Sequence, residues 1–209
     1  MAYDLQEQEQ IDSLKLFWTQ WGKLIGGAVL AVSVGFLGFK GWQYYQRTQA
    51  EAAAVVYSQL QDQLQAGKLD DVKATVELLE RDYRSSQLAA NAAMLAAKLA
   101  FERNDAGFAR AQLKWVLAQS NDETLQAVAH LRLASVLLDD KQFDAALAEL
   151  GSPHPAAFDS LFLDLKGDVL VARGDNNGAR ESYKAALAKA ALDAPARDFI
   201  QTKLDSVGN

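Results

Sequence analysis

Two histidines have the most versatile side-chain chemistry in this chain, because imidazole both binds metals and transfers protons near neutral pH. His130 lies in an Ala/Leu-rich stretch, and His154 lies between two prolines. Neither has an acidic residue at the spacing of a metal site such as HExxH. The chain has no cysteine, which excludes disulfides, thiolate metal sites and cysteine nucleophiles. We therefore expect neither a metal site nor a cofactor.

Three acidic pairs and one glycine-containing loop are the other candidates for catalysis. The pairs are Asp70-Asp71, Asp122-Glu123 and Asp139-Asp140. Each pair falls at an expected helix start or turn, where helix capping and the helix dipole explain acidic residues. The loop ARGDNNGAR lacks the preceding strand and the Gly-Lys-Ser/Thr ending of a phosphate-binding loop. The sequence therefore predicts a protein that is not an enzyme.

The composition indicates a helical protein with one soluble domain. The chain has 209 residues, of which 50% are hydrophobic, and only 3 prolines. Alanine supplies much of the hydrophobic share, and alanine-rich, proline-poor sequence favours helix. The formal net charge of -6 argues against a nucleic-acid partner, because phosphates require a basic face. We expect an all-α protein that binds no nucleic acid.

An uncharged run, LIGGAVLAVSVGFLGF, lies between Lys23 and Lys40. Aromatic residues flank the run on both sides, and both lysines can extend their amines toward water, as is typical of the two interfaces of a membrane. We predict a single transmembrane helix at residues 22–45, after a short tail at residues 1–21. The predicted interfacial anchors are Trp18, Trp21, Lys23, Lys40, Trp42, Tyr44 and Tyr45.

A cleaved signal peptide and a buried core helix are the alternatives to an uncleaved anchor. A signal peptide has a basic start and a small-residue cleavage site directly after its apolar core. Here the tail is acidic, and the nearest A-x-A, at residues 50–52, lies beyond the aromatic residues. Aromatic residues at both ends favour the anchor over both alternatives. Its orientation stays open, because two lysines precede the run and Lys40 and Arg47 follow it.

Small residues recur every four positions within the predicted span, at Gly27, Ala31 and Gly35. They leave one helix face nearly bare of side chains, which lets a second helix approach closely. Small residues are also common in membrane helices generally. We predict this stripe as a helix-packing face, either in a homo-oligomer or against a larger membrane complex.

From residue 46 to residue 209, amphipathic segments alternate with short polar breaks. The clearest unit, LKGDVLVARGDNNGARESYKAAL, matches the small and large positions of a tetratricopeptide repeat. The small residues expected in the second helices of the units are Ala74, Ala111, Ala146 and Ala179. Their spacings of 37, 35 and 33 residues are close to the repeat period of about 34. We predict a tetratricopeptide-like α-solenoid of about four helical hairpins, with an irregular helical bundle as the alternative.

The last stretch, from Ala194 to Val207, predicts one more helix, which is entered through Pro195. Stacked repeats need such a helix to cap their open end. The residues expected to point inward are Phe199, Ile200 and Leu204.

The inner face of such a solenoid comes from the first helix of each pair, and its shape suits a peptide or protein segment. The repeat register predicts that apolar, hydroxyl and acidic side chains of the two best-matching units point to this face. These candidate partner-binding residues are Leu131, Ser135, Leu138, Asp164, Asp168 and Val171.

Four segments of the chain carry a resemblance to a known family. They are EQEQIDSLKLFWTQWGK, the glycine-rich span ending GWQYYQ, DETLQAVAHLRLASVLLDDKQFDAALAEL and FLDLKGDVLVARGDNNGARESYKAAL. In their order, spacing and total length they resemble the YfgM family, the ancillary subunits of the bacterial SecYEG translocon. The resemblance covers nearly the whole chain and brings no catalytic motif with it.

The resemblance implies a location and partners that the residues alone leave open. It implies a single pass through the bacterial inner membrane, with the tail in the cytoplasm and the repeat domain, residues 46–209, in the periplasm. The implied partners are Sec translocon subunits, a membrane-anchored periplasmic chaperone of the prolyl-isomerase type and client polypeptides. The implied task is to pass emerging polypeptides toward periplasmic chaperones. A scaffold for another inner-membrane assembly and an envelope stress regulator stay open as alternatives.

Overall fold

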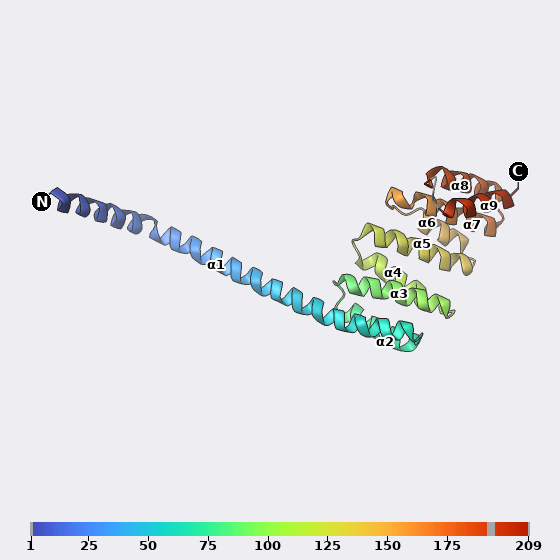
Figure 1. The fold of residues 1–209 in the computed structure, drawn as a ribbon, viewed down its shortest axis with the longest axis horizontal. Helices are drawn as coiled ribbons and strands as arrows, with labels where there is room; N and C mark the ends of the chain where they lie inside the picture. The colour runs from blue at the N-terminus through green and yellow to red at the C-terminus, as the bar shows by residue number, and fades with distance from the viewer. Residues whose placement is uncertain (1, 192–194, 209) are drawn as a thin grey trace. The chain divides into compact units, whose positions relative to one another are not determined.

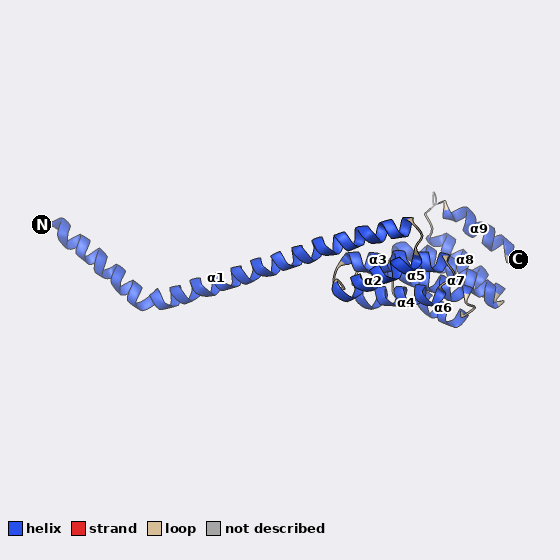
Figure 2. Ribbon diagram, turned by 90° about the horizontal axis from the view of Figure 1, so that it is seen from below, coloured by secondary structure: helices blue, strands red, loops and turns tan. Residues whose placement is uncertain are grey.

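The computed structural model describes residues 2–191 and 195–208, with side chains from Lys15 onward except that of Ile25. These residues form helices joined by turns, and none of them lies in a strand (Figure 2). This confirms the predicted all-α fold. The chain forms two compact units, residues 1–51 and residues 52–209.

Helix α1 (Ala2–Gln65) accounts for the described residues of the first unit and ends in the second unit (Figure 1). Its large apolar side chains between Leu16 and Tyr45 are exposed, for example Val32 at 73%. Among the described helices it alone is long and apolar enough to cross a membrane, and none of its apolar stretch is buried. A core helix of a soluble protein is mostly buried, whereas this stretch is exposed, so the alternative of a buried core helix is wrong.

The second unit begins with residues 52–65 of α1 and continues as a series of short helices. They are α2 (Leu69–Asp82), α3 (Gln87–Glu102), α4 (Ala106–Gln119), α5 (Glu123–Asp139), α6 (Phe143–Leu150), the 3₁₀ turn η1 (Ala156–Phe158), α7 (Asp159–Arg173), α8 (Asn176–Lys189) and α9 (Ala196–Ser206). Helices α3 and α4, α5 and α6, and α7 and α8 pack as hairpins, and α2 packs against α3. Residues 52–65 of α1 and helix α2, joined through Gly67, form the first hairpin. Together with the other three pairs they give the four hairpins that the sequence predicts.

Each hairpin turns through one residue with a left-handed backbone. These residues are Gly67, Asn104, Lys141 and Gly174, with φ of 64°, 62°, 59° and 89°. In every case the N–H of the next residue donates to the carbonyl five residues earlier, at 2.8–3.2 Å, which satisfies a carbonyl at the end of the first helix. The spacings of 37, 37 and 33 residues show one turn geometry repeated along the chain.

The same turn fixes which residues the second helix of each hairpin buries. Five residues after the turn residue the side chain is fully buried, at Val72, Ala109, Ala146 and Ala179. Four residues further on it is buried again, at Val76, Leu113, Leu150 and Tyr183. The predicted markers Ala74 and Ala111 are wrong, because both side chains are exposed. The register of the first two repeats is shifted by two residues from the predicted one.

Helix α9 packs against α8 and closes the far end of the repeats, as predicted. Ile200 is 1% exposed, and Leu204 packs against the apolar cluster of Leu170 and Tyr183. Phe199 is 73% exposed, so its predicted inward position is wrong. A helix with neighbours on one side buries a single stripe, and the stripe through Ile200 and Leu204 leaves Phe199 in solvent. The predicted start at Ala194 lies outside the described residues.

Candidate binding groove of the helical repeats

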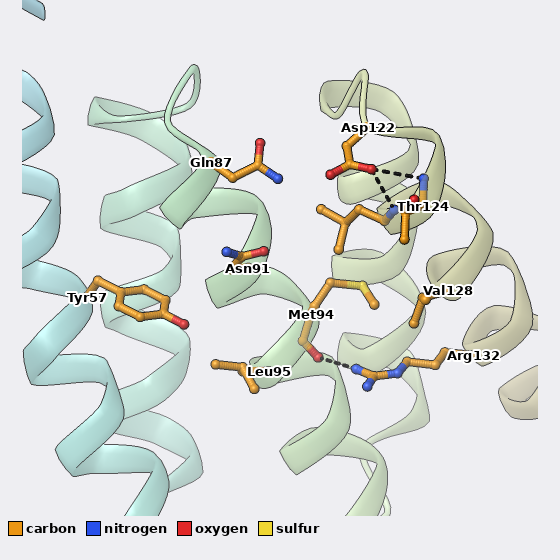
Figure 3. Close-up of a pocket in the computed structure, with 10 residues that line it drawn as sticks. Tyr57, Gln87, Asn91, Met94, Leu95, Asp122, Thr124, Val128 and Arg132 are labelled. Carbon is orange, nitrogen blue, oxygen red and sulfur yellow. Dashed lines mark hydrogen bonds between the residues drawn. The ribbon is translucent and has the colours of Figure 1, made fainter.

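A groove runs between the first helices of the first three hairpins, α1, α3 and α5. It encloses about 340 Å³, and Figure 3 shows its lining side chains as sticks. The lining residues are Tyr57, Gln87, Asn91, Met94, Leu95, Asp122, Thr124, Leu125, Val128 and Arg132. The groove lies within the second unit, so its walls belong to one body.

The groove uses the repeat positions that the sequence predicts for the inner face. Tyr57 and Met94 lie ten residues before the turn residues of their hairpins, as do the predicted Leu131 and Asp164. Asn91 and Val128 share another repeat position, thirteen residues before the turn, which the sequence prediction does not assign to the inner face. The first two hairpins thus line the groove with a predicted inner-face position, and the third lines it through Val128 and its neighbours.

Neutral polar groups and one capped acid line the groove. The Tyr57 hydroxyl and the side-chain amides of Gln87 and Asn91 make no hydrogen bond to any residue that the structure describes. Asp122 caps α5, because its Oδ1 accepts from the backbone N–H of Thr124 at 2.9 Å and of Leu125 at 3.1 Å. The only carboxylate of the groove lining thus uses one of its two oxygens to cap the helix.

Arg132 is the cation of the groove and is partly buried in its wall. Its Nη1 donates to the carbonyl oxygen of Met94 at 3.1 Å, which ties α5 to α3 (Figure 3). No carboxylate forms an ion pair with it in the described part of the chain. A second hollow of about 230 Å³ begins on the other side of Arg132, where Lys98, Phe101 and Ser135 line it.

The sequence model of the tetratricopeptide repeat-like domain family matches residues 15–209 of the chain. Over 208 residues, the chain is 35% identical to the ancillary SecYEG translocon subunit of Neisseria gonorrhoeae, covering 99% of this chain and 100% of the relative. Relatives of the same name from Haemophilus influenzae (34% over 188 residues, 89% and 91% covered) and Escherichia coli (28% over 201 residues, 96% of each) also match. The chain belongs to the family of ancillary SecYEG translocon subunits.

The six predicted inner-face residues lie in different surroundings: against the core, in a hollow, in ion pairs or in solvent. Leu131 and Leu138 are half-buried and pack against the main core. Ser135 lines the second hollow, and its hydroxyl donates to the carbonyl of Leu131 at 3.1 Å. Val171 is 39% exposed. A role of these side chains in binding a partner stays a prediction.

Asp164 and Asp168 face the capping helix α9 of this family member instead of an open hollow. Lys203 Nζ donates to Asp164 Oδ2 at 2.9 Å and to Asp168 Oδ2 at 2.8 Å, and the Tyr183 hydroxyl donates to Asp168 Oδ1 at 2.9 Å. Burial raises the pKa of Asp164 despite the hydrogen bond from Lys203. Burial works against the charge of Lys203 as well, but the hydrogen bonds to both carboxylates outweigh it and raise the lysine pKa.

The groove residues of the first two repeats are missed by the sequence prediction. The shifted markers Ala74 and Ala111 leave α1 and α3 without a register, so Tyr57, Asn91 and Met94 are not assigned to a face. A usable signal is present, since Asp105 lies four residues before Ala109 just as Asp175 lies four residues before Ala179. Both aspartates cap the second helix of their hairpin.

The membrane-helix candidates lie on the exposed surface of α1. A methyl group added at Gly27 or Gly35 would meet nothing within 4 Å, so the stripe through Ala31 is open to another helix. The predicted anchors Trp21 and Trp42 are 49% and 59% exposed. They are 21 residues apart in the sequence, or about 32 Å along a helix axis, close to the bilayer core of about 30 Å.

The two histidines of the chain have structural partners. His130 Nδ1 lies 2.7 Å from Glu149 Oε2, which joins α5 to α6. The His154 ring stacks on Phe162 with 3.7 Å between ring centroids, and its Nδ1 donates to the Ser152 carbonyl at 2.8 Å. Nowhere in the described residues do three or more His, Cys, Asp or Glu side chains gather as metal ligands would.

Proposed function

We propose that this chain is a non-enzymatic, membrane-anchored adaptor that associates with the Sec translocon and passes emerging polypeptides to periplasmic chaperones. Its membership in the family of ancillary SecYEG translocon subunits carries the association. The groove between α1, α3 and α5 supports a polypeptide as the bound species, because apolar side chains there alternate with free amide and hydroxyl groups.

In this proposal, residues 22–45 span the inner membrane once, residues 1–21 lie in the cytoplasm and residues 46–209 lie in the periplasm. Aromatic residues at both ends of the apolar stretch support an uncleaved anchor. Tethering confines the repeat domain near the exit of the translocon, where even a weak contact forms often because the effective concentration is high. A membrane-anchored chaperone of the prolyl-isomerase type would meet the domain there.

The small-residue stripe supplies the second contact of the proposed adaptor. Gly27, Ala31 and Gly35 would let a translocon helix, or a second copy of the chain, approach the α1 backbone within the bilayer. Their open surroundings support this, and the seven anchors would hold the stripe at the depth of a neighbouring span.

In-cell photo-crosslinking of the full chain tests the two contacts separately. A photoreactive amino acid at Ala31 should capture a translocon subunit, and one at Asn91 should capture a chaperone or a translocating polypeptide. Matched control positions are Val29, which points away from the stripe, and Lys114, which is exposed on α4. Products from the controls equal to those from Ala31 and Asn91 would contradict the proposal. Capture of only another inner-membrane assembly would favour the alternative of a scaffold for that assembly. Capture of only stress-signalling proteins would favour an envelope stress regulator.

The proposed orientation has its own test. Protease added to intact spheroplasts should digest residues 46–209 and leave the N-terminal tail protected, as read by antibodies against tags at the two ends. Protection of the repeat domain instead would overturn both the orientation and the periplasmic task.

A further inference from the structure

We infer that the groove between α1, α3 and α5 selects an extended polypeptide segment in which an acidic side chain stands next to an apolar one, with the carboxylate on Arg132. This inference rests on the proposed function, since it names the chemistry of the polypeptide that the groove would hold. The proposed occupant is a segment of another polypeptide that carries an internal acidic side chain, and it is not a second copy of this chain.

Charge complementarity is the first argument. Arg132 is partly buried in the groove wall, and its one hydrogen bond, to the Met94 carbonyl, leaves most of its N–H donors without a protein acceptor among the described residues. A guanidinium binds a carboxylate through two parallel hydrogen bonds, which neutral groups do not reproduce. The chain as a whole is acidic, yet Arg132, the one cation of the groove lining, has no ionic partner among the described residues.

The carboxylates near the groove are committed elsewhere. Asp122 accepts two backbone N–H groups at the start of α5. Further along the same face, Asp164 and Asp168 share Lys203. On the far side of Arg132, Lys98 adds a second positive charge, whose contact with Glu102 is loose at 3.8 Å. A basic segment would therefore meet repulsion at Arg132, and the one carboxylate of the groove lining, Asp122, already accepts two backbone N–H groups through Oδ1.

The rest of the lining selects the neighbours of the acidic side chain. Met94, Leu95 and Val128 form the apolar part of the groove next to Arg132 (Figure 3). Burial of an apolar side chain there contributes most of the affinity, and the charge contributes the selectivity. The amides of Gln87 and Asn91 and the Tyr57 hydroxyl can pair with the backbone of an extended segment, which has unpaired N–H and C=O groups along its length.

Binding of defined peptides to the full chain in lipid nanodiscs tests the inference. The probe is a dye-labelled peptide, Gly-Ser-Leu-Glu-Leu-Ser-Gly, amidated at its C-terminus so that its single carboxylate is the glutamate. Two further peptides replace that glutamate with glutamine or lysine. Fluorescence anisotropy should rank the affinities as glutamate, glutamine, lysine, with about a fivefold gap or more between glutamate and glutamine, as expected for a charge-assisted hydrogen bond worth about 1 kcal/mol net.

Variants assign the selectivity to the groove. Arg132→Gln should remove the preference for glutamate over glutamine, and Arg132→Lys should keep part of it, because the charge remains but the paired donors do not. Val128→Asp should abolish binding of the glutamate peptide by repulsion. Lys114→Gln removes one positive charge from the exposed face of α4 and should change nothing. Circular dichroism of each variant shows whether the fold is retained.

The outcomes separate this inference from the proposed function. Equal affinities for the three peptides, unchanged in Arg132→Gln, would overturn the acidic selectivity and leave a groove that binds polypeptides. Absence of binding by all three peptides, together with absence of crosslinks from Asn91 in cells, would overturn the groove as a polypeptide site. Tighter binding of the lysine peptide would overturn the charge argument itself.

Discussion

The first and fourth repeats form equivalent helix crossings from opposite choices of side chain. In the fourth repeat, Gly167 in α7 faces Tyr183 in α8, and a Cβ at position 167 would lie 2.3 Å from the tyrosine ring. In the first repeat the equivalent residues, seven residues before and nine after the turn residue, are Leu60 and Val76, both fully buried. Where one helix carries a large side chain, the other carries a small one.

The second and third repeats fit between these extremes. Their pairs at the same positions are Ala97 with Leu113 and Ala134 with Leu150, all buried. The second-helix residue becomes larger as the first-helix residue becomes smaller, from Leu60 with Val76, through the two Ala–Leu pairs, to Gly167 with Tyr183, as expected when two close-packed helices must both fill the space at their crossing. The comparison teaches that the repeat is defined by the pair, and that the fourth repeat has the least tolerance for change.

The largest expected effect is at this crossing in the fourth repeat. Gly167→Ala drives a methyl group into the Tyr183 ring, which must shift and lose its hydrogen bond to Asp168. Overpacking of this kind costs about 3 kcal/mol of unfolding free energy. Chemical denaturation of the full chain in detergent, followed by circular dichroism, measures the loss.

A matched control and a rescue sharpen this prediction. Gly107→Ala lies in the first turn of α4, where the added methyl group meets only Asp105 Oδ1 at 3.7 Å, so stability should hold or rise slightly. The double variant Gly167→Ala with Tyr183→Leu copies the second repeat and should be more stable than Gly167→Ala alone. Additive losses in the double variant would contradict the idea of a paired crossing.

The helices and turns of this fold could be predicted from sequence because their signals are local. Short polar breaks separate the amphipathic segments, and the turns at Gly67 and Gly174 fall within such breaks, between helices. The register of the first two repeats could not be predicted from small residues alone. In the first repeat Val72 occupies the position of an alanine, and exposed Ala74 lies two residues away.

The candidate site depended on longer-range information. Asp164 and Asp168 have the correct repeat positions for an inner face, but Lys203, 35 residues beyond Asp168, reaches them from α9. The groove around Arg132 requires three helices to be in register at once, and the turn residues reveal that register only when all four hairpins are compared. The positions were predictable from the repeat, whereas the partners of each charged side chain were not.

A smaller effect concerns how the two ends of the domain bury carboxylates. In the fourth repeat, Asp164 and Asp168 form ion pairs with Lys203. In the first repeat, Glu80 has no ion-pair partner among the described residues, and its buried Oε1 accepts no hydrogen bond from them. Burial raises the Glu80 pKa to about 7, against a hydrogen bond from Gln112 that lowers it. Between pH 4.5, the ordinary pKa of glutamate, and about pH 7, the folded state therefore keeps a proton on Glu80 that the unfolded chain releases.

Stability should accordingly fall as the pH rises from about 4.5 to about 7, because the folded state binds more protons than the unfolded state across that window. Since Glu80 is only partly buried, we expect a loss of about 1–2 kcal/mol. Glu80→Gln should flatten this part of the profile and be more stable than the parent above pH 7. Glu181→Gln, at a 75% exposed side chain on α8, is the control and should leave the profile unchanged. Denaturation at a series of pH values decides, and an identical slope in Glu80→Gln would refute the assignment.

The smallest expected effect is at the turn that all four repeats share. Lys141 has φ of 59° where the first and fourth repeats have glycine. A side chain in the left-handed region costs about 1 kcal/mol, and glycine adopts it freely, although glycine also loses more backbone entropy on folding. Lys141→Gly should therefore stabilise the third repeat by about 0.5 kcal/mol, the net of these opposing effects. Gly174→Ala, the reverse exchange, should destabilise the fourth repeat by about 1 kcal/mol. If both variants lost stability equally, the lysine would contribute through its side chain, and the turn would not be set by backbone geometry alone.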